Sequence, residues 1–204
     1  MKKGLLMVIS GPSGCGKGTV CKQLIKKHPE IKVSISATTR DQREGEVDGR
    51  EYFFISKEKF ESDIENNGFL EYAKIYSGQY YGTPKKFVMD TLDSGNDLIL
   101  EIDIQGALQV KEKFEEGVFI FLVPPTMDTL RNRLITRGRE SEDLIQERFN
   151  AAFKELDYAK HYDYVVVNDQ LDQTISDVEA IITSEKLKTN RNTNLINNII
   201  NGGK

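Results

Sequence analysis

A glycine-rich segment directly after a short apolar run constrains this chain more than any other feature of its sequence. Residues 5–9 are all apolar, residues 11–19 read GPSGCGKGT, and helical spacing of apolar positions follows over residues 17–27. A short apolar run bounded by turn residues predicts a central strand of a parallel sheet. The pattern G-x-x-x-x-G-K between a strand and a helix predicts a loop that binds the phosphates of a nucleoside triphosphate.

The chemistry of this loop depends on its backbone. Glycines let successive N–H groups converge on phosphate oxygens, and the start of the following helix favours an anion. Lys17 is expected to bridge the β- and γ-phosphates. The residues expected to bind ATP here are Gly11, Pro12, Ser13, Gly14, Cys15, Gly16, Lys17, Gly18 and Thr19.

Two residues of the loop need separate comment. Gly18 stands where the pattern usually has Ser or Thr, and Thr19 follows one position later, so we expect Thr19 to hold a phosphate oxygen. This change leaves open whether a loop hydroxyl coordinates magnesium directly. We interpret Cys15 as a small loop residue whose amide meets phosphate rather than as a redox thiol.

The apolar pattern of the first strand recurs along the chain. Further strands are predicted at residues 31–35, 97–104, 118–123 and 164–167. Helical spacing separates them, at residues 83–94, 107–115, 127–136, 144–159 and 175–187. Alternating strands and helices predict an α/β fold, a doubly wound parallel sheet with helices on both faces.

Two polar segments interrupt this alternation. Residues 36–84 are rich in glycine, charge and aromatic side chains, with strand-like pieces at 50–55 and 69–73, and predict an inserted subdomain. Residues 127–148 contain several arginines and a hinge candidate, Gly138, and predict a lid. The core is then expected at 1–35, 85–126 and 149–186, followed by an Asn-rich tail at 187–204, interpreted as frayed, with a short docking helix as the alternative.

Composition excludes several classes of protein. A length of 204 residues fits one domain with inserts. The chain has 28 basic and 32 acidic residues, and this net charge of −4 argues against a nonspecific nucleic-acid binder. No apolar window approaches the roughly 18 residues of a membrane span or the pattern of a signal peptide. Cys15 and Cys21 match neither a disulfide framework nor a zinc site, so we expect a cytoplasmic protein.

The inserted segment carries groups suited to a second nucleotide. Arg40 and Arg43 lie three residues apart, and a pair of guanidinium groups can neutralise a phosphate dianion. Tyr52 and Tyr81 can add hydroxyl donors. Glu71 is an acceptor for paired N–H donors, which guanine presents at N1 and N2 and adenine lacks.

Further motifs follow the glycine loop in order. They read S-x-T-T-R-x-x-R-x-G-E-x-x-G-x-x-Y-x-F at 36–54, G-x-Y-Y-G-T at 78–83, L-E-I-D-x-Q-G at 100–106, R-L-x-x-R-G at 133–138, E-R at 147–148 and V-N-D at 167–169. With the loop, this set resembles the guanylate kinase family over residues 4–186. The resemblance implies a three-layer P-loop kinase fold with a central parallel sheet, an inserted GMP-binding subdomain and a lid.

The resemblance also implies a role for each matching residue. Guanine would be contacted by Ser36, Glu71, Thr83 and Asp103, and the GMP phosphate by Arg40, Arg43, Tyr52 and Tyr81. The transferring phosphoryl group would be covered by Arg133, Arg137 and Arg148, with Arg148 also on the GMP side and Asn168 near the base of ATP. The expected catalytic residues are Lys17, Arg40, Arg137 and Arg148. Glu101, where many relatives have Asp, joins the GMP side and is expected to hold magnesium through water.

The implied reaction is ATP + GMP to ADP + GDP, with dGMP as a second acceptor, in purine nucleotide metabolism and GMP recycling. Mg²⁺ is expected to accompany ATP. A direct in-line transfer needs no covalent intermediate, because the attacking phosphate oxygen is already anionic. The expected partners are these small molecules, with no nucleic acid and no membrane, and the chain is expected to be a monomer or a homodimer.

Other classes remain as alternatives. Guanylate-kinase-like domains of scaffold proteins bind phosphorylated peptides without catalysis, but they usually lack an intact phosphate loop. A kinase for AMP or dTMP would share the loop and differ in the acceptor pocket. A regulatory GTPase is disfavoured because no N-K-x-D pattern follows the loop.

Overall fold

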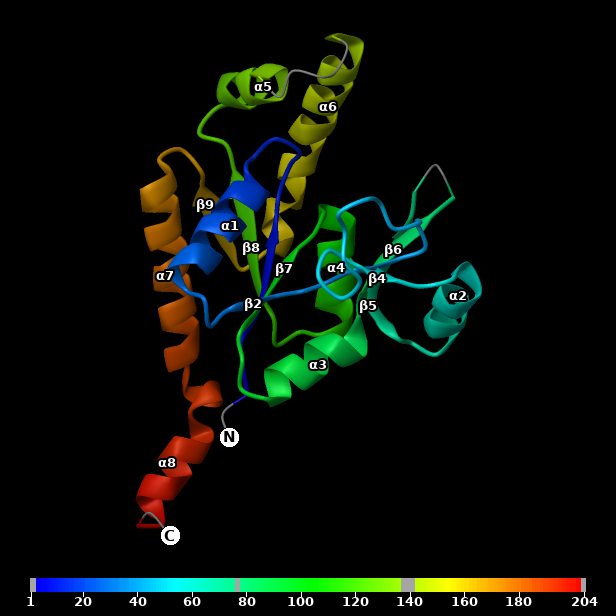
Figure 1. Cartoon of the computed structure of the whole chain (residues 1–204). Coiled ribbons are helices and arrows are strands. Elements are labelled where there is room, and N and C mark those ends of the chain that lie inside the picture. The colour runs from blue at the N-terminus through cyan, green and yellow to red at the C-terminus, as the bar shows by residue number, and fades with distance from the viewer. Residues whose placement is uncertain (1–2, 76–77, 137–141, 203–204) are drawn as a thin grey trace.

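A five-stranded parallel sheet forms the centre of the molecule. The structure is a computed structural model that describes residues 3–75, 78–136 and 142–202. The strand order is β2-β7-β1-β8-β9, and all four neighbouring pairs are parallel (Figure 1). The strands are β1 (Leu6–Ser10), β2 (Lys32–Val33), β7 (Leu98–Glu101), β8 (Val118–Val123) and β9 (Tyr164–Val167). The predicted α/β fold with a central parallel sheet is confirmed.

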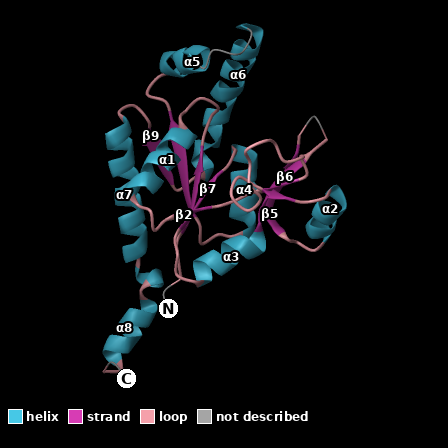
Figure 2. Ribbon diagram, viewed as in Figure 1, coloured by secondary structure: helices cyan, strands magenta, loops and turns pink. Residues whose placement is uncertain are grey.

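Helices cover both faces of this sheet, which makes three layers (Figure 2). Side chains alternate along a strand. Met7 and Ile9 of β1 therefore pack in a core with α1 (Lys17–Lys27) and α7 (Leu171–Leu187). Leu6 and Val8 pack in a second core against α3 (Lys85–Asp93) and α4 (Ile104–Lys113).

A smaller sheet, with the order β4-β3-β6-β5, lies beside α4. Its strands are β3 (Ala37–Thr38), β4 (Phe53–Phe54), β5 (Phe69–Lys74) and β6 (Tyr80–Pro84). Phe60 stacks between Phe69 and Tyr80, with ring centroids at 4.2 and 5.1 Å, and gives this sheet its own core. The strand predicted at 50–55 is shorter than expected, since only Phe53–Phe54 pair with β3.

One helix of this segment, α2 (Lys57–Glu65), was not predicted from the sequence. Ser56 caps it, because the side chain of Ser56 accepts a hydrogen bond from the amide of Lys59 at 3.2 Å. Phe60 and Ile64 then face the aromatic core at a spacing of one turn. The cap and this spacing are the signals that could have revealed it.

Two helices stand above the phosphate loop. They are α5 (Met127–Thr136) and α6 (Glu142–Glu155), and α6 continues into a 3₁₀ helix, η1 (Leu156–His161). Leu130 and Leu134 of α5 pack with Ala152 of α6 in a small core. Arg137 and Gly138 lie outside the described residues.

The carboxyl-terminal segment contradicts the expectation of a frayed tail. After α7 come a short 3₁₀ helix, η2 (Thr189–Arg191), and the helix α8 (Thr193–Ile200), which extends away from the sheet (Figure 1). Asn192 donates side-chain hydrogen bonds to the carbonyls of Lys186 and Lys188, which holds the turn between the helices. The docking alternative is not met either, because α8 buries none of its residues. Within the described ranges, every helix is too short or too polar to cross a bilayer.

Candidate nucleotide-binding site

The phosphate loop connects β1 to α1, as the sequence predicts. Gly11, Gly14 and Gly16 have φ angles of 143°, 87° and 96°, a region that favours glycine. Space is also tight: a Cβ at Gly11 would lie 2.2 Å from the carbonyl oxygen of Leu122, and one at Gly16 would lie 2.3 Å from Asn168 Nδ2. The loop therefore needs glycine for both its turn and its close packing.

Lys17 is folded back across this loop. Its Nζ donates to the carbonyl oxygens of Gly11 at 2.7 Å and Pro12 at 3.2 Å. The ammonium group is thus held above the backbone that a phosphate would approach. Gly16 precedes α1 without a side-chain cap, so the start of the helix stays open to an anion.

A cleft of about 540 Å³ opens between the phosphate loop, α5 and the end of β9. Its lining includes Gly14, Gly16, Thr19, Arg133 and Asn168. Sequence reasoning placed Asn168 near the base of ATP, but its buried amide is already engaged: Nδ2 donates to the Cys15 carbonyl at 2.7 Å, and Oδ1 accepts from Thr174 at 3.2 Å. Asn168 therefore fixes the shape of the loop.

Arg133 reaches into the same cleft from α5. Its Nη2 donates to the carbonyl of Asn168 at 2.9 Å, whereas its Nη1 is buried without a hydrogen-bond partner. A buried charged donor without a partner is rare and costly. Its position beside the loop suits an anionic oxygen of a nucleotide.

Both cysteines are buried, Cys15 within the loop and Cys21 on α1. Burial raises the pKa of the Cys15 thiol, although the charge of Lys17 opposes the shift. A raised pKa keeps the thiol protonated and unreactive. This agrees with the interpretation of Cys15 as a small packing residue.

A second group of polar side chains gathers where β5, β6 and α4 meet. Glu71 and Thr83 are partners in the β5–β6 register, and Thr83 Oγ1 donates to Glu71 Oε1 at 2.6 Å. Asp103 caps α4 through the amide of Gly106 at 2.7 Å. A Cβ at Gly106 would lie 3.1 Å from Glu71 Oε2, so glycine lets the two carboxylates approach.

Glu71 and Thr83 of this group are buried, whereas Asp103 is exposed. Burial raises the pKa of Glu71, and the nearby charge of Asp103 adds to the shift. Two carboxylates and a hydroxyl at one place offer acceptors for several N–H donors. The structure thus brings Glu71, Thr83 and Asp103 together as the sequence predicts.

The arginine side of the insert is also organised. Arg40 makes a bidentate ion pair with Glu46, at 2.7 and 2.9 Å, and its guanidinium lies 5.3 Å from the ring centre of Tyr52. Tyr52 and Tyr81 meet edge to face at 5.8 Å. The hydrogen bond from Arg40 lowers the pKa of Glu46 to about 2.

Sequence reasoning assigned no role to Glu46. Its carboxylate also accepts from the amide of Arg43 at 2.8 Å, so it joins both arginines of the predicted phosphate site. The signal was present, because Glu46 is the final residue of the R-x-x-R-x-G-E pattern. A carboxylate three residues after an arginine pair is a candidate partner for it.

The remaining predicted residues are more scattered. Ser36 precedes β3, Glu101 ends β7, and Arg148 is half-buried on α6. The side chain of Arg43 is exposed. Arg137 lies outside the described residues, so its predicted place over the phosphoryl group stays a prediction.

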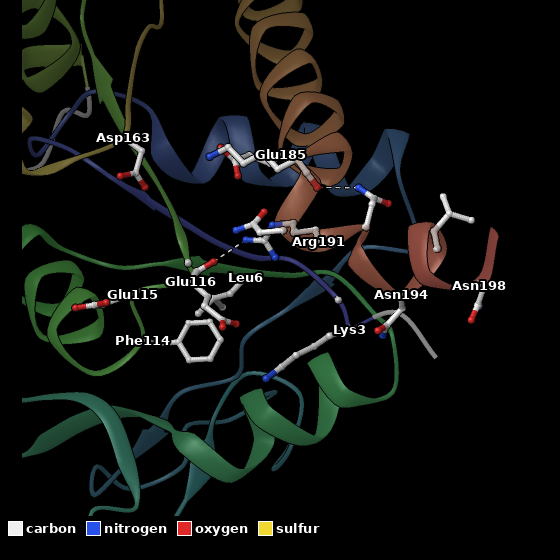
Figure 3. Close-up of a pocket in the computed structure, with 16 residues that line it drawn as sticks. Lys3, Leu6, Phe114, Glu115, Glu116, Asp163, Glu185, Arg191, Asn194 and Asn198 are labelled. Atoms are coloured by element: carbon white, nitrogen blue, oxygen red, sulfur yellow. Dashed lines mark hydrogen bonds and ion pairs between the residues drawn. The ribbon is translucent and has the colours of Figure 1, made fainter. Parts of the chain in front are cut away.

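A larger cavity of about 830 Å³ lies at the opposite end of the sheet (Figure 3). Its lining includes Leu6, Gly117 and Asp163, which lie at or just before the amino ends of β1, β8 and β9. Arg191 spans it and donates to the carbonyl of Glu116 at 2.6 Å. Ligands of open parallel sheets bind at the carboxyl ends of strands, so the nucleotide site belongs to the cleft at the phosphate loop.

Comparison with known proteins shows that this chain is similar to guanylate kinases. A family model described as guanylate kinase matches residues 3–185. A curated guanylate kinase of Caldanaerobacter subterraneus subsp. tengcongensis is 59% identical, over 95% of this chain and 94% of the relative. One of Clostridium tetani is 56% identical, over 94% of this chain and 91% of the relative. The crystal structure of guanylate kinase from Anaplasma phagocytophilum has a TM-score of 0.71 at 33% identity, covering 94% of this chain and 90% of that chain.

Proposed function

Because this chain belongs to the guanylate kinase family, we propose that it transfers the γ-phosphoryl group of ATP to GMP and releases ADP and GDP. The observation that carries the proposal is the presence of two distinct polar sites, one at the phosphate loop and one where β5, β6 and α4 meet. The phosphate loop suits a triphosphate, and the Glu71–Thr83–Asp103 group suits a base rich in N–H donors.

The acceptor base is selected by carboxylates. Guanine presents donors at N1 and N2, which match the acceptors of Glu71 and Asp103, and adenine has no donor at N1. Ser36 and Thr83 add hydroxyl groups on the same side. An adenine in this place would present no N1 donor to the buried Glu71 carboxylate, and a buried acceptor left without its donor strongly disfavours the wrong substrate.

The acceptor phosphate is held by the charged side of the insert. Arg40 is positioned by Glu46 and by the rings of Tyr52 and Phe54, and Tyr81 and Arg43 lie in the same region. Arginine binds phosphate through paired N–H groups. In this arrangement the GMP phosphate oxygen is directed toward the donor and needs no general base, since it is already anionic.

The donor phosphates occupy the loop at residues 11–19. Lys17 exchanges its carbonyl partners for phosphate oxygens, and Arg133 uses the N–H that has no partner in the protein. Arg148 and Arg137 complete the positive charge around the transferring group. Charge placed in advance where the transition state develops it is the main source of catalysis in this type of reaction.

Magnesium bound to ATP neutralises phosphate charge and orients the triphosphate. The residues at the loop fit such a cation, because the Glu101 carboxylate lies beside the Cα of Gly18, in space that a side chain there would fill. Carboxylate oxygens and water are the ligands that Mg²⁺ prefers. Glu101 would hold the cation, directly or through water.

Closure completes the site. The insert at 36–84 and the lid at 127–148 move over the core formed by residues 1–35, 85–126 and 149–186. This motion brings Arg133, Arg137 and Arg148 to the phosphoryl group and keeps water, a competing acceptor, away from it.

The test is ADP release from ATP and Mg²⁺ with GMP, dGMP, AMP, dTMP or no acceptor. We expect turnover with GMP and with dGMP, and only background with the others. Activity restricted to AMP or dTMP would contradict guanine selection. Silence with every acceptor, from folded protein that still binds GMP, would favour a binding module instead.

A matched pair of variants tests the phosphate loop in the same assay. Lys17→Ala is expected to lower kcat by about 100-fold or more, the loss typical of a group that stabilises transition-state charge. Lys22→Ala removes an exposed lysine from the same helix and is expected to keep the wild-type rate. Equal rates for the two variants would contradict the role of Lys17.

A further inference from the structure

Gly18 and Glu101 lie against each other at the edge of the phosphate loop. Gly18 is in the first turn of α1, and Glu101 ends β7 beside Ile9 of β1. A Cβ built on Gly18 would lie 3.1 Å from Glu101 Oε1. This is closer than the usual contact of about 3.5 Å or more between such atoms. The Glu101 carboxylate therefore occupies the space into which a side chain at position 18 would project.

The helix α1 also holds this carboxylate in place. Cys21 lies one turn after Gly18 on the same helix face, and its thiol makes a side-chain hydrogen bond to Glu101. The bare Cα of Gly18 and the thiol of Cys21 thus flank the Glu101 carboxylate on one face of α1.

Thr19 does not occupy the same place. Successive residues of an α-helix point about 100° apart. Thr19 lines the donor cleft together with Gly16, Arg133 and Asn168. Position 18 faces Glu101 instead. The hydroxyl of Thr19 is therefore on a different side of α1 from the carboxylate.

We propose that Gly18 and Glu101 are a matched pair. The G-x-x-x-x-G-K-[ST] pattern has a side-chain hydroxyl directly after its lysine, and in this chain the Glu101 carboxylate takes the place of that hydroxyl. Glu101 thereby supplies the oxygen that faces the cation of ATP. The inference rests on the proposed transfer from ATP and goes beyond it. It links the two positions at which the chain departs from the expected motifs. The close approach of the Glu101 carboxylate to the Cα of residue 18 depends on the absence of a side chain there.

The length of the acidic side chain matters in this arrangement. Aspartate at position 101 is one methylene shorter and would withdraw its oxygens from the space above Gly18. A hydroxyl at position 18 would then be able to fill that space. Serine at position 18 is thus expected to increase the affinity for the metal-bound nucleotide when residue 101 is aspartate. When residue 101 is glutamate, the same serine is expected to leave this affinity without any gain.

The experiment measures binding of MnADP, with ADP in EDTA as the metal-free control. Mn²⁺ is observed by EPR and by the relaxation of water protons, so no turnover is needed. Glu101→Asp is expected to weaken MnADP about tenfold, the order of loss seen when support of a bound metal is removed. Binding of metal-free ADP is expected to stay unchanged, because the contact is made through the cation.

Two double variants provide the decisive comparison. Gly18→Ser with Glu101→Asp is expected to restore MnADP affinity to within about threefold of wild type, whereas Gly18→Ala with Glu101→Asp restores none of it. Serine and alanine at position 18 both add a Cβ, but only serine adds an oxygen. Gly18→Ser alone is expected to bring no gain, and thermal unfolding without ligand checks that each variant is folded.

Three results would overturn the proposal. These are wild-type MnADP affinity in Glu101→Asp, equal rescue by serine and alanine at position 18, or the same gain from Gly18→Ser in the wild-type background as in the Glu101→Asp background. GMP turnover of the wild type, measured in parallel, tests the proposed function separately. If the chain binds MnADP through this pair but does not phosphorylate GMP, the proposed function is contradicted and the inference about Gly18 and Glu101 is supported.

Discussion

At the scale of single residues, the site contains side chains that are positioned before any ligand arrives. Arg40 is the clearest example. Glu46 holds it through two hydrogen bonds, and the rings of Tyr52 and Phe54 lie 5.3 and 5.5 Å from its guanidinium carbon. Holding a side chain in its binding geometry lowers the entropy lost when the ligand binds.

Replacing Glu46 tests whether this positioning matters. Glu46→Gln is expected to raise the KM for GMP by roughly tenfold with little change in the KM for ATP, because an Arg40 that is less well positioned holds the acceptor phosphate less well. Steady-state kinetics with each substrate varied measures both constants. Glu51→Gln is the matched control, since Glu51 bonds Val47 and Arg50 in the same loop. A lower KM for GMP in Glu46→Gln would mean that Glu46 competes with the phosphate instead.

Glu71 gives a second prediction at this scale, with a sign set by its raised pKa. The folded protein binds this proton more tightly than the unfolded chain, whose glutamate pKa is about 4.3. Stability without ligand therefore falls as pH rises from that value through the raised pKa. GMP affinity rises over the same window, because guanine N–H donors need the ionised carboxylate.

Calorimetric titration of GMP at a series of pH values upward from the unfolded glutamate pKa of about 4.3 measures this dependence. Glu71→Gln is expected to weaken GMP by about 10- to 100-fold, the value of one hydrogen bond to a charged group, and to flatten the profile. Glu65→Gln, at the exposed end of α2, is the control. A Glu71→Gln variant with the wild-type pH profile would place guanine recognition elsewhere.

At the scale of elements, α1 and α7 are joined at two levels. Their apolar faces meet in the core through Leu24, Val178 and Ile182. At the surface, Glu179 of α7 accepts from His28 Nε2 at 2.6 Å and from Lys27 at 2.8 Å, at the end of α1. The contact lies away from the phosphate loop and supports a structural role for His28.

This contact predicts a pH dependence of stability. The hydrogen bond to Glu179 raises the pKa of His28. A raised histidine pKa stabilises the fold fully below the unfolded value of about 6.5, and this contribution is lost as pH rises through the folded value. Unfolding midpoints should fall over this window in wild type and not in His28→Gln. His161→Gln is the control, and a fall that persists in His28→Gln would assign the effect to another group.

At the scale of the whole molecule, the carboxyl-terminal helix is separate from the fold that carries the site. No residue of α8 is buried, and Leu195, Ile196, Ile199 and Ile200 are all exposed. The residues just before it do belong to the fold. Lys186 pairs with Asp97, and Arg191 bonds the carbonyl of Glu116.

Two truncations test this division. Removal of residues 193–204 is expected to leave GMP turnover unchanged within about twofold and the unfolding midpoint within about 2 °C, because no buried surface is lost. Removal of residues 186–204 also deletes the Lys186 and Arg191 contacts and is expected to lower the midpoint by several degrees. A marked loss of stability in the shorter truncation would show that α8 packs on something in solution.

Local patterns were sufficient for much of the fold. The phosphate loop and the strands at 118–123 and 164–167 follow from apolar runs and turn residues, whose spacing depends only on neighbouring residues. Boundaries failed where a side chain had a second role. Residues 97–104 were predicted as one strand, but Asp103 caps α4 through Gly106, and the helix begins at Ile104.

The identity of the site residues could also be predicted, but their partners could not. Glu71 and Asp103 were assigned from their motifs, and the structure adds that Gly106 lets them meet. Three contacts were not predicted from the sequence: the ion pair of Glu46 with Arg40, the hydrogen bond of Asn168 to the Cys15 carbonyl, and the packing of Glu101 against Gly18. Composition and periodicity, which are local, determine elements and motif chemistry. The contacts of Asn168 with Cys15 and of Glu101 with Gly18 join segments far apart in the chain, so they exist only once the sheet sets its strand order. Glu46 lies only six residues from Arg40, and its contact depends on the local fold of one loop.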